Sequence, residues 1–204
     1  MNSLRAADFR RMGRETMQGN FGMIFLVLLI GGAIVGALSV TAIGSIIVAG
    51  PIAVGMAFVL VALTRKESVE LGDMFNGFRT GFTDNLLAGL LVSVFTFLWS
   101  LLFIVPGIIK SYAYSMTPYI LADEPGTPAM EAISRSQEMM KGHKWQYFCM
   151  QFSFIGWVLL CAVTFGLAAI YVMPYMAAAQ AAFYNELKKE YAPADGPMEG
   201  TVEG

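Results

Sequence analysis

The sequence predicts an all-α, polytopic integral membrane protein with about six transmembrane helices in three hairpins, each preceded by a short interfacial amphipathic helix. Three observations lead to this prediction. The chain has too few charges for a water-soluble surface, its uncharged runs are long enough to cross a bilayer, and one order of elements recurs along it. Together they favour a single helical membrane domain over residues 1–191.

The amino-acid composition is typical of an integral membrane protein. Of the 204 residues, 56% are hydrophobic and only 14% are charged, whereas a soluble domain carries about 25% charged residues. The mean hydropathy of +0.60 agrees. The net charge is −2, so no basic field indicates a nucleic-acid partner. We therefore expect membrane lipids, and no nucleic acid, around this chain.

Long uncharged runs set the number of crossings. Residues 16–64, 85–109 and 145–185 contain no Asp, Glu, Lys or Arg, and one crossing needs about 20 apolar residues. The first and last runs each hold two crossings, and residues 85–122 hold two more if Lys110 is tolerated near a helix end. The expected crossings are residues 21–41, 50–64, 85–105, 107–122, 145–167 and 174–190.

The chain divides into three similar units, at about residues 3–66, 68–124 and 127–191. Each unit begins with an amphipathic segment, continues into a crossing and restarts near a proline, which suits a turn because it lacks the amide hydrogen. These restarts are Gly50-Pro51, Pro106-Gly107 and Met173-Pro174. Each returning helix then ends at charged residues, namely Arg65-Lys66, Asp123-Glu124, and Glu186 with Lys188-Lys189.

The amphipathic segments are expected to lie in the membrane interface with their apolar faces down. In the third unit, Glu131 and Arg135 have the spacing of an ion pair along a helix. In the second unit, five apolar side chains have the spacing of a helical stripe. This candidate interfacial stripe consists of Leu71, Met74, Phe75, Phe78 and Phe82.

The basic residues predict the orientation. If the crossings come in pairs, every Lys and Arg except Lys110 falls on one side, together with all the acidic residues. Basic residues near crossings are retained in the cytoplasm, so both termini are expected there. The tail, residues 192–204, is rich in Pro, Gly and acidic residues and is expected to be disordered. A soluble or membrane protein partner would meet this cytoplasmic face, and a homo-oligomer is compatible with the sequence.

A polar fourth crossing is the candidate intramembrane site. Charged residues inside a membrane are costly and often functional, so one interpretation is a pocket for a lipid headgroup or a small anion. The other is an anchor whose lysine reaches the headgroups, with hydroxyls that bond neighbouring helices. The residues of this candidate polar pocket are Lys110, Ser111, Tyr114, Ser115 and Thr117. Elsewhere, Gly32 and Gly36 form a GxxxG pattern typical of close helix contact.

No catalytic pattern is present in the sequence. His143 is the only histidine, so a histidine-based metal cluster is excluded. Nucleophile-elbow, phosphate-loop and zinc-protease motifs are all missing. We therefore expect a protein that is not an enzyme and that binds no cofactor or metal.

Several blocks carry a family resemblance. They include Ile104-Val105-Pro106-Gly107-Ile108-Ile109-Lys110, Tyr119-Ile120-Leu121-Ala122-Asp123, Lys141-Gly142-His143-Lys144-Trp145 and Pro174-Tyr175. Over about residues 3–190 the chain resembles an uncharacterised bacterial integral-membrane family, domain of unknown function 975. It is also distantly similar to the membrane portion of glycerophosphodiester phosphodiesterases, without their catalytic domain. The resemblance implies a helical fold in the bacterial inner membrane and brings no established activity.

Two functions remain open from the sequence. The first is a non-enzymatic membrane module that binds a partner or modifies the membrane, for example in envelope stress or protection from antimicrobial peptides. The second is a small transporter or lipid-handling protein that uses the polar fourth helix. The first predicts that the aromatic part of the stripe matters most, and the second predicts a cavity that reaches Lys110.

Overall fold

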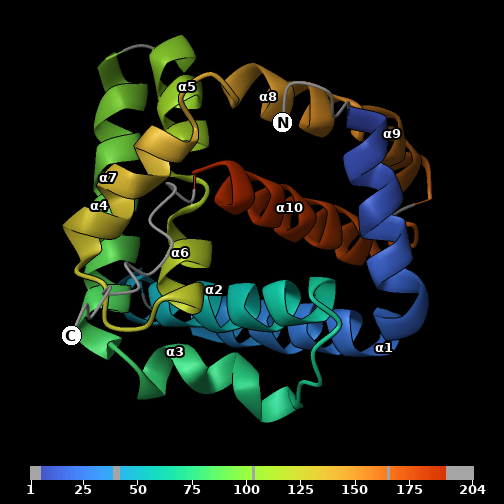
Figure 1. Ribbon diagram of the computed structural model, residues 1–204, viewed down its shortest axis with the longest axis horizontal. Helices are drawn as coiled ribbons and strands as arrows, with labels where there is room; N and C mark the ends of the chain where they lie inside the picture. The colour runs from blue at the N-terminus through green and yellow to red at the C-terminus, as the bar shows by residue number, and fades with distance from the viewer. Residues whose placement is uncertain (1–5, 39–41, 103, 165, 192–204) are drawn as a thin grey trace, which may run out of the picture.

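Every element in the described part of the chain is a helix, as the sequence predicts (Figure 1). The computed structural model describes residues 6–38, 42–102, 104–164 and 166–191, so the expected tail lies outside the described residues. The elements are α1 (Ala6–Leu38), α2 (Ala42–Thr64), the 3-10 helix η1 (Leu71–Phe75), α3 (Asn76–Arg79), α4 (Phe82–Leu102), α5 (Ile104–Tyr114), α6 (Thr117–Asp123), α7 (Ala129–Met139), α8 (Lys144–Phe152), α9 (Ile155–Val163) and α10 (Ala169–Tyr191).

Two helices in the described chain are long and apolar enough to cross a membrane. They are Ala6–Ala37 of α1 and Phe82–Leu101 of α4, and only 17% and 11% of their most apolar windows is buried. A core helix of a soluble protein would be mostly buried, so their exposure favours contact with lipid. The apolar stretch Val48–Thr64 of α2 is shorter. These helices indicate membrane association, and the six-crossing topology stays a prediction.

The helix breaks differ from those expected at the prolines. Helix α2 continues through Pro51 and α10 continues through Pro174. In contrast, the expected crossing 107–122 is interrupted between α5 and α6, and the expected crossing 145–167 is interrupted between α8 and α9. Pro118 lies in the first turn of α6, where a missing amide hydrogen starts a helix more easily than it continues one.

Two local departures from regular α-helix lie next to expected crossings. In α1, Asn20 has non-helical angles (φ −128°, ψ 17°), and this kink separates the amphipathic part of the helix from its apolar part. The expected stripe helix of the second unit is instead divided into η1, α3 and the start of α4, with Gly81 at φ +61° in between. Glycine suits this turn because a side chain is strained at positive φ.

Each amphipathic segment packs on a returning helix of another unit. The amphipathic part of α1 packs on α10, η1 and α3 pack on α2, and α7 packs on α5 and α6. Small residues allow these contacts: a Cβ on Gly13 would lie 2.8 Å from the Ala179 nitrogen, and Gly77 leaves no room for one against Pro51. The contact of α1 with α10 brings the first and last described helices together. The exact unit boundaries stay a prediction.

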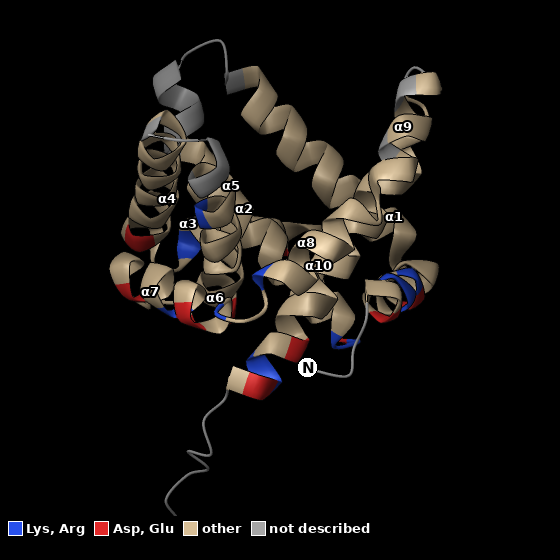
Figure 2. Cartoon of the chain, turned by 90° about the horizontal axis from the view of Figure 1, so that it is seen from above, with Lys and Arg blue, Asp and Glu red and all other residues tan. Residues whose placement is uncertain are grey.

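Charged residues gather on one side of the molecule. Figure 2 shows the Lys, Arg, Asp and Glu residues mostly in the lower half of the view, whereas α9 and the upper part of α4 are uncharged. Arg65 and Lys66, which follow α2, and the last residues of α6 and α10 carry part of this charge. The fold therefore separates an apolar body from a charged face.

Candidate functional site

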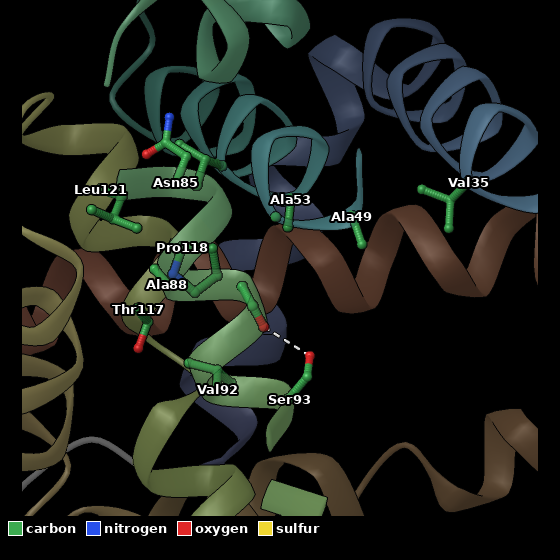
Figure 3. Close-up of a pocket in the computed structure, with 13 residues that line it drawn as sticks. Val35, Ala49, Ala53, Asn85, Ala88, Val92, Ser93, Thr117, Pro118 and Leu121 are labelled. Carbon is green, nitrogen blue, oxygen red and sulfur yellow. Dashed lines mark hydrogen bonds between the residues drawn. The ribbon is translucent and has the colours of Figure 1, made fainter. Parts of the chain in front are cut away.

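A cavity of about 360 Å³ lies between α2, α4 and α6, with a contribution from α1 (Figure 3). Its volume falls within the range of small-ligand pockets, about 300–1,000 Å³. Apolar side chains form most of the wall, and none of the described residues that line it is charged. The lining includes Val35, Ala49, Ala53, Ala88, Val92 and Leu121.

Small residues on facing helices create the cavity. A Cβ on Gly89 would lie 2.7 Å from the Cα of Gly50, so the backbones of α4 and α2 approach closely at this pair. Such close approach is possible only where both positions lack a side chain. Ala53 and Ala88 are the neighbouring wall residues. Their methyl groups are too small to fill the remaining space, so a cavity remains beside the glycine contact.

Two polar side chains in the lining have their hydrogens in use. The Asn85 amide nitrogen donates to the carbonyl oxygens of Gly77 at 2.7 Å and Thr80 at 2.8 Å. It thereby joins the end of α3 to the start of α4. The Ser93 hydroxyl donates to the Gly89 carbonyl at 2.8 Å, as Figure 3 shows. These groups therefore stabilise the wall.

Thr117, unlike Asn85 and Ser93, has a buried side-chain polar group without a hydrogen-bond partner in the described structure. Its side chain is buried, with 1% of the residue exposed, and its Oγ1 has no hydrogen-bond partner among the described residues. Buried side-chain hydroxyls nearly always have a partner. Arg10 Nε is the other buried side-chain atom of this kind in the described chain, and it lies outside the cavity lining.

The opposite end of α6 carries a network of ion pairs. Arg65 donates two hydrogen bonds to the Asp123 carboxylate, at 2.5 and 3.0 Å, and Lys188 also donates to it. The Tyr184 hydroxyl donates to the same carboxylate at 3.1 Å. Asp123 thus links the ends of α2, α6 and α10. We refer to Arg65, Asp123, Glu124, Arg135 and Lys188 as the ion-pair cluster.

The cluster fixes the charge of its carboxylates. Burial alone would raise the pKa of Asp123, but the hydrogen bonds and charges of Arg65 and Lys188 outweigh it and lower the pKa to about 2. The Arg135 hydrogen bonds to Glu124, at 2.5 and 3.1 Å, likewise lower the pKa of that carboxyl group. Both carboxylates are therefore ionised at neutral pH.

Sequence analysis noted the charged residues at each helix end separately. It did not predict that they meet in one ion-pair cluster. It also predicted an ion pair between Glu131 and Arg135. That prediction is wrong, because Arg135 instead forms a bidentate pair with Glu124. A two-point pair with a carboxylate is stronger than a single contact along an exposed helix face.

The five residues of the candidate polar pocket do not line one cavity in the described structure. Lys110 Nζ lies 5.0 Å from the centre of the Trp99 ring, a cation–π contact. The hydroxyls of Ser111, in α5, and Ser115, just past its end, each donate to a carbonyl of α5 at 2.8 Å. Tyr114 is buried against Phe95. Of the five, Thr117 alone lines the cavity, and a role for the others stays a prediction.

The candidate interfacial stripe divides into buried and exposed parts. Met74 is fully buried and packs against the backbone of α2 at Gly55. Phe75 and Phe82 are exposed, and Phe78 lies between them with ring centres 6.4 and 6.0 Å away. Leu71 is also exposed. The stripe thus presents Phe75 and Phe82 on the surface, with the half-buried ring of Phe78 between them.

A second, wider groove of about 970 Å³ opens at the charged face between α1, α2 and α10. Arg65, Lys66, Lys188 and Lys189 line it together with Glu15 and Glu186. Lys189 pairs with Glu186 at 2.6 Å. Among the described residues, no group of three His, Cys, Asp or Glu side chains could hold a metal ion.

Comparisons with known proteins give one family match. Residues 103–191 match the model of a family described as a protein of unknown function (DUF975), so the second half of this chain is similar to that family. The matched part includes α6 and the ion-pair cluster except Arg65. No curated protein and no solved structure matches the chain. Similarity to glycerophosphodiester phosphodiesterases stays a prediction.

Proposed function

We propose that this chain is an integral membrane protein that holds a hydrocarbon chain of a membrane lipid in the cavity between α2, α4 and α6. One observation carries the proposal: the cavity has the size of a ligand pocket and an uncharged, mostly apolar wall. Transfer of a methylene group from water into such a wall releases about 0.8 kcal/mol. Within a bilayer the gain is smaller, because lipid tails are equally apolar, so shape decides what binds.

The proposed setting is the bacterial inner membrane, with about six crossings and both termini in the cytoplasm. The one-sided distribution of charge in Figure 2 and the two long apolar helices support it. The proposed role is not enzymatic. It is the lipid-handling alternative left open by the sequence, with the binding cavity beside α6 instead of around Lys110.

The topology is tested by labelling single cysteines in whole cells and in inverted membrane vesicles. The two free cysteines, Cys149 and Cys161, are first replaced by alanine. The changes Ala7→Cys and Arg79→Cys should then be labelled from the cytoplasmic side, and Leu167→Cys from the other side. Labelling of Ala7→Cys and Arg79→Cys from opposite sides would contradict the paired crossings.

Lipid binding is tested with a phosphatidylethanolamine that carries a diazirine in one acyl chain, reconstituted with the protein in liposomes. After illumination, crosslinks should concentrate on residues 49–54 and 85–93. Ala53→Phe places a ring in the cavity and should remove these crosslinks. Ala33→Phe makes the same change on an exposed face of α1 and should leave them in place. Even labelling of all exposed helices, unaffected by Ala53→Phe, would refute the cavity.

The exposed aromatic rings of the stripe favour a second candidate function, the docking of a protein partner at the cytoplasmic face. Phe75 and Phe82 are exposed beside Phe78, and the proposed topology would put them at the cytoplasmic face. Such a module would fit the envelope-stress or antimicrobial-peptide role expected from the sequence. Phe75→Ser with Phe82→Ser should then abolish rescue of a deletion phenotype, whereas Ala53→Phe should not. Full rescue by the double serine variant would exclude this candidate.

A further inference from the structure

We infer that the groove at the charged face binds the phosphate headgroup of an anionic membrane lipid, and that Lys66 contacts the phosphate. The groove lies between α1, α2 and α10 and shares no lining residue with the cavity between α2, α4 and α6. The inference therefore goes beyond the proposed function and takes from it only the membrane setting.

The groove lies where the apolar part of the chain ends. Both ends of the uncharged run 16–64, Thr16 and Thr64, belong to its lining. So does Asn20, at the kink where the apolar part of α1 begins. Lipid headgroups lie at this boundary between apolar helix and charged residues. The groove is therefore at headgroup depth, and its volume of about 970 Å³ is within the range of ligand pockets.

The lining carries more positive than negative charge. Four of its described side chains are cationic and two are carboxylates. Both carboxylates have cationic partners, Glu186 with Lys189 at 2.6 Å and Glu15 with Arg11 at 3.8 Å. An anion that enters the groove therefore meets no carboxylate of the lining that lacks a cation.

The ion-pair cluster adds to this excess of positive charge. Its three cations, Arg65, Arg135 and Lys188, share two carboxylates, so the cluster keeps one positive charge. Arg65 and Lys188 also line the groove. The field of the cluster thus attracts an anion to the groove, and the proposed cytoplasmic leaflet is the one that is rich in anionic lipids.

Lys66 is the cation of the lining without an ion pair among the described residues, since Arg65, Lys188 and Lys189 all have one. The next residue, Glu67, lines a separate small cavity between α2 and α6. Lys66 is exposed. Its ammonium is a point charge on a flexible stem, which suits a phosphate group.

The backbone at Lys66 is unusual for a lysine. Its φ is +61°, and the other described residues with positive φ are glycines. The Lys66 amide donates to Leu63 O at 3.1 Å and the Glu67 amide donates to Ala62 O at 2.9 Å, the two bonds of a Schellman motif. Glycine is usual at this position because a side chain is strained there. A lysine at a strained position of a groove indicates a functional side chain.

The experiment measures lipid affinity by native mass spectrometry of the full chain purified in detergent, with phosphatidylglycerol and phosphatidylcholine as probes. Wild type should bind phosphatidylglycerol more tightly, because the choline cation cancels the phosphate charge. Lys66→Gly should lower this affinity about tenfold, the effect of one charge-assisted hydrogen bond. Lys66→Arg, which keeps the charge, should retain it. Lys141→Ala removes an exposed lysine outside the lining and should bind as wild type does.

A second measurement separates binding from helix capping, because a cation also suits the carboxyl end of a helix. Lys66→Gly should melt at the wild-type temperature or above it, since glycine relieves the strain at positive φ. A lower melting temperature would assign Lys66 to the end of α2 and overturn the inference. Equal affinity of wild type for the two lipids, or full affinity for phosphatidylglycerol in Lys66→Gly, would overturn it as well.

Two further arms identify the source of the phosphate and the site. Equimolar inorganic phosphate should not displace phosphatidylglycerol, and displacement would overturn the choice of a lipid. Ala53→Phe, which fills the cavity between α2, α4 and α6, should leave the affinity unchanged. Loss of phosphatidylglycerol binding in Ala53→Phe would place the lipid in that cavity and overturn the groove. The cavity and the groove can therefore fail separately.

Discussion

The two ends of the seven-residue helix α6 differ in how their polar groups are satisfied. At its last residue, Asp123 accepts hydrogen bonds from Arg65, Lys188 and Tyr184. At its first residue, the Thr117 hydroxyl is buried and has no partner in the described protein. Both ends are closely packed, so burial alone does not distinguish them. The difference indicates that the charged end holds three helices together, whereas the cavity end leaves one buried hydroxyl unsatisfied.

The comparison predicts that the charged end dominates stability. Asp123→Ala removes the shared acceptor of Arg65 and Lys188, whose side chains are about a third exposed, and loss of these charge-assisted hydrogen bonds costs about 2 kcal/mol. Thermal unfolding in detergent should show a clear loss. Glu186→Ala, which breaks a pair with the exposed Lys189, is the control and should cost less than about 1 kcal/mol. Equal losses in the two variants would remove the special role of the cluster.

The dependence of folding stability on pH also tests the role of Asp123. The pKa of Asp123 is lowered from 3.8 to about 2, so its stabilisation is present above pH 4 and is lost as the pH falls through the folded value. The loss should amount to about 2 kcal/mol, and Asp123→Asn should lack this component. Unfolding measured by circular dichroism between pH 5 and 2 gives the comparison. A profile for Asp123→Asn that parallels the wild type would assign the acid sensitivity to other groups.

The cavity wall predicts a contrast between two glycines. Gly89→Ala would place a Cβ 2.7 Å from the Cα of Gly50, and such overpacking costs about 2 kcal/mol. Gly32 has nothing within 4 Å of its Cβ position, so Gly32→Ala should be neutral or slightly stabilising. Melting temperatures of the two variants test this contrast. A larger loss for Gly32→Ala would restore the GxxxG contact expected from the sequence.

The smallest effects concern two buried hydroxyls. Ser136→Ala removes a donor to Ala113 O and an acceptor of the Met116 amide, and should cost about 1–2 kcal/mol. Thr117→Val removes a hydroxyl without a partner in the described protein, and should cost almost nothing in lipid-free detergent. The free energies of unfolding of the two variants, measured in parallel, test this difference. A loss for Thr117→Val as large as for Ser136→Ala would mean that Thr117 has a structural partner.

Local patterns predicted much of the fold. The uncharged runs gave the helical class, and the expected start of the first crossing at residue 21 directly follows the kink at Asn20. The sequence did not predict that helices continue through Pro51 and Pro174, or that breaks occur before Thr117 and Ile155. Proline marks a turn only where the packing does not favour a continuous helix, and packing depends on residues far away in the chain.

The candidate site was predictable only in part. Thr117 was singled out among the polar residues of the fourth crossing, but the cavity depends on Gly50 and Gly89, which lie on separate helices and meet only in the fold. The ion-pair cluster also depends on such long-range contacts, because Arg65 and Asp123 belong to different units. Short-range spacing instead favoured Glu131 for Arg135, and this was wrong.

The most direct test of the central claim is an experimental structure of the protein in a lipid nanodisc, with a bound antibody fragment to aid image alignment. The account predicts continuous density for one hydrocarbon chain between α2, α4 and α6. A cavity closed by direct contact of these helices, or one that holds only water, would contradict it.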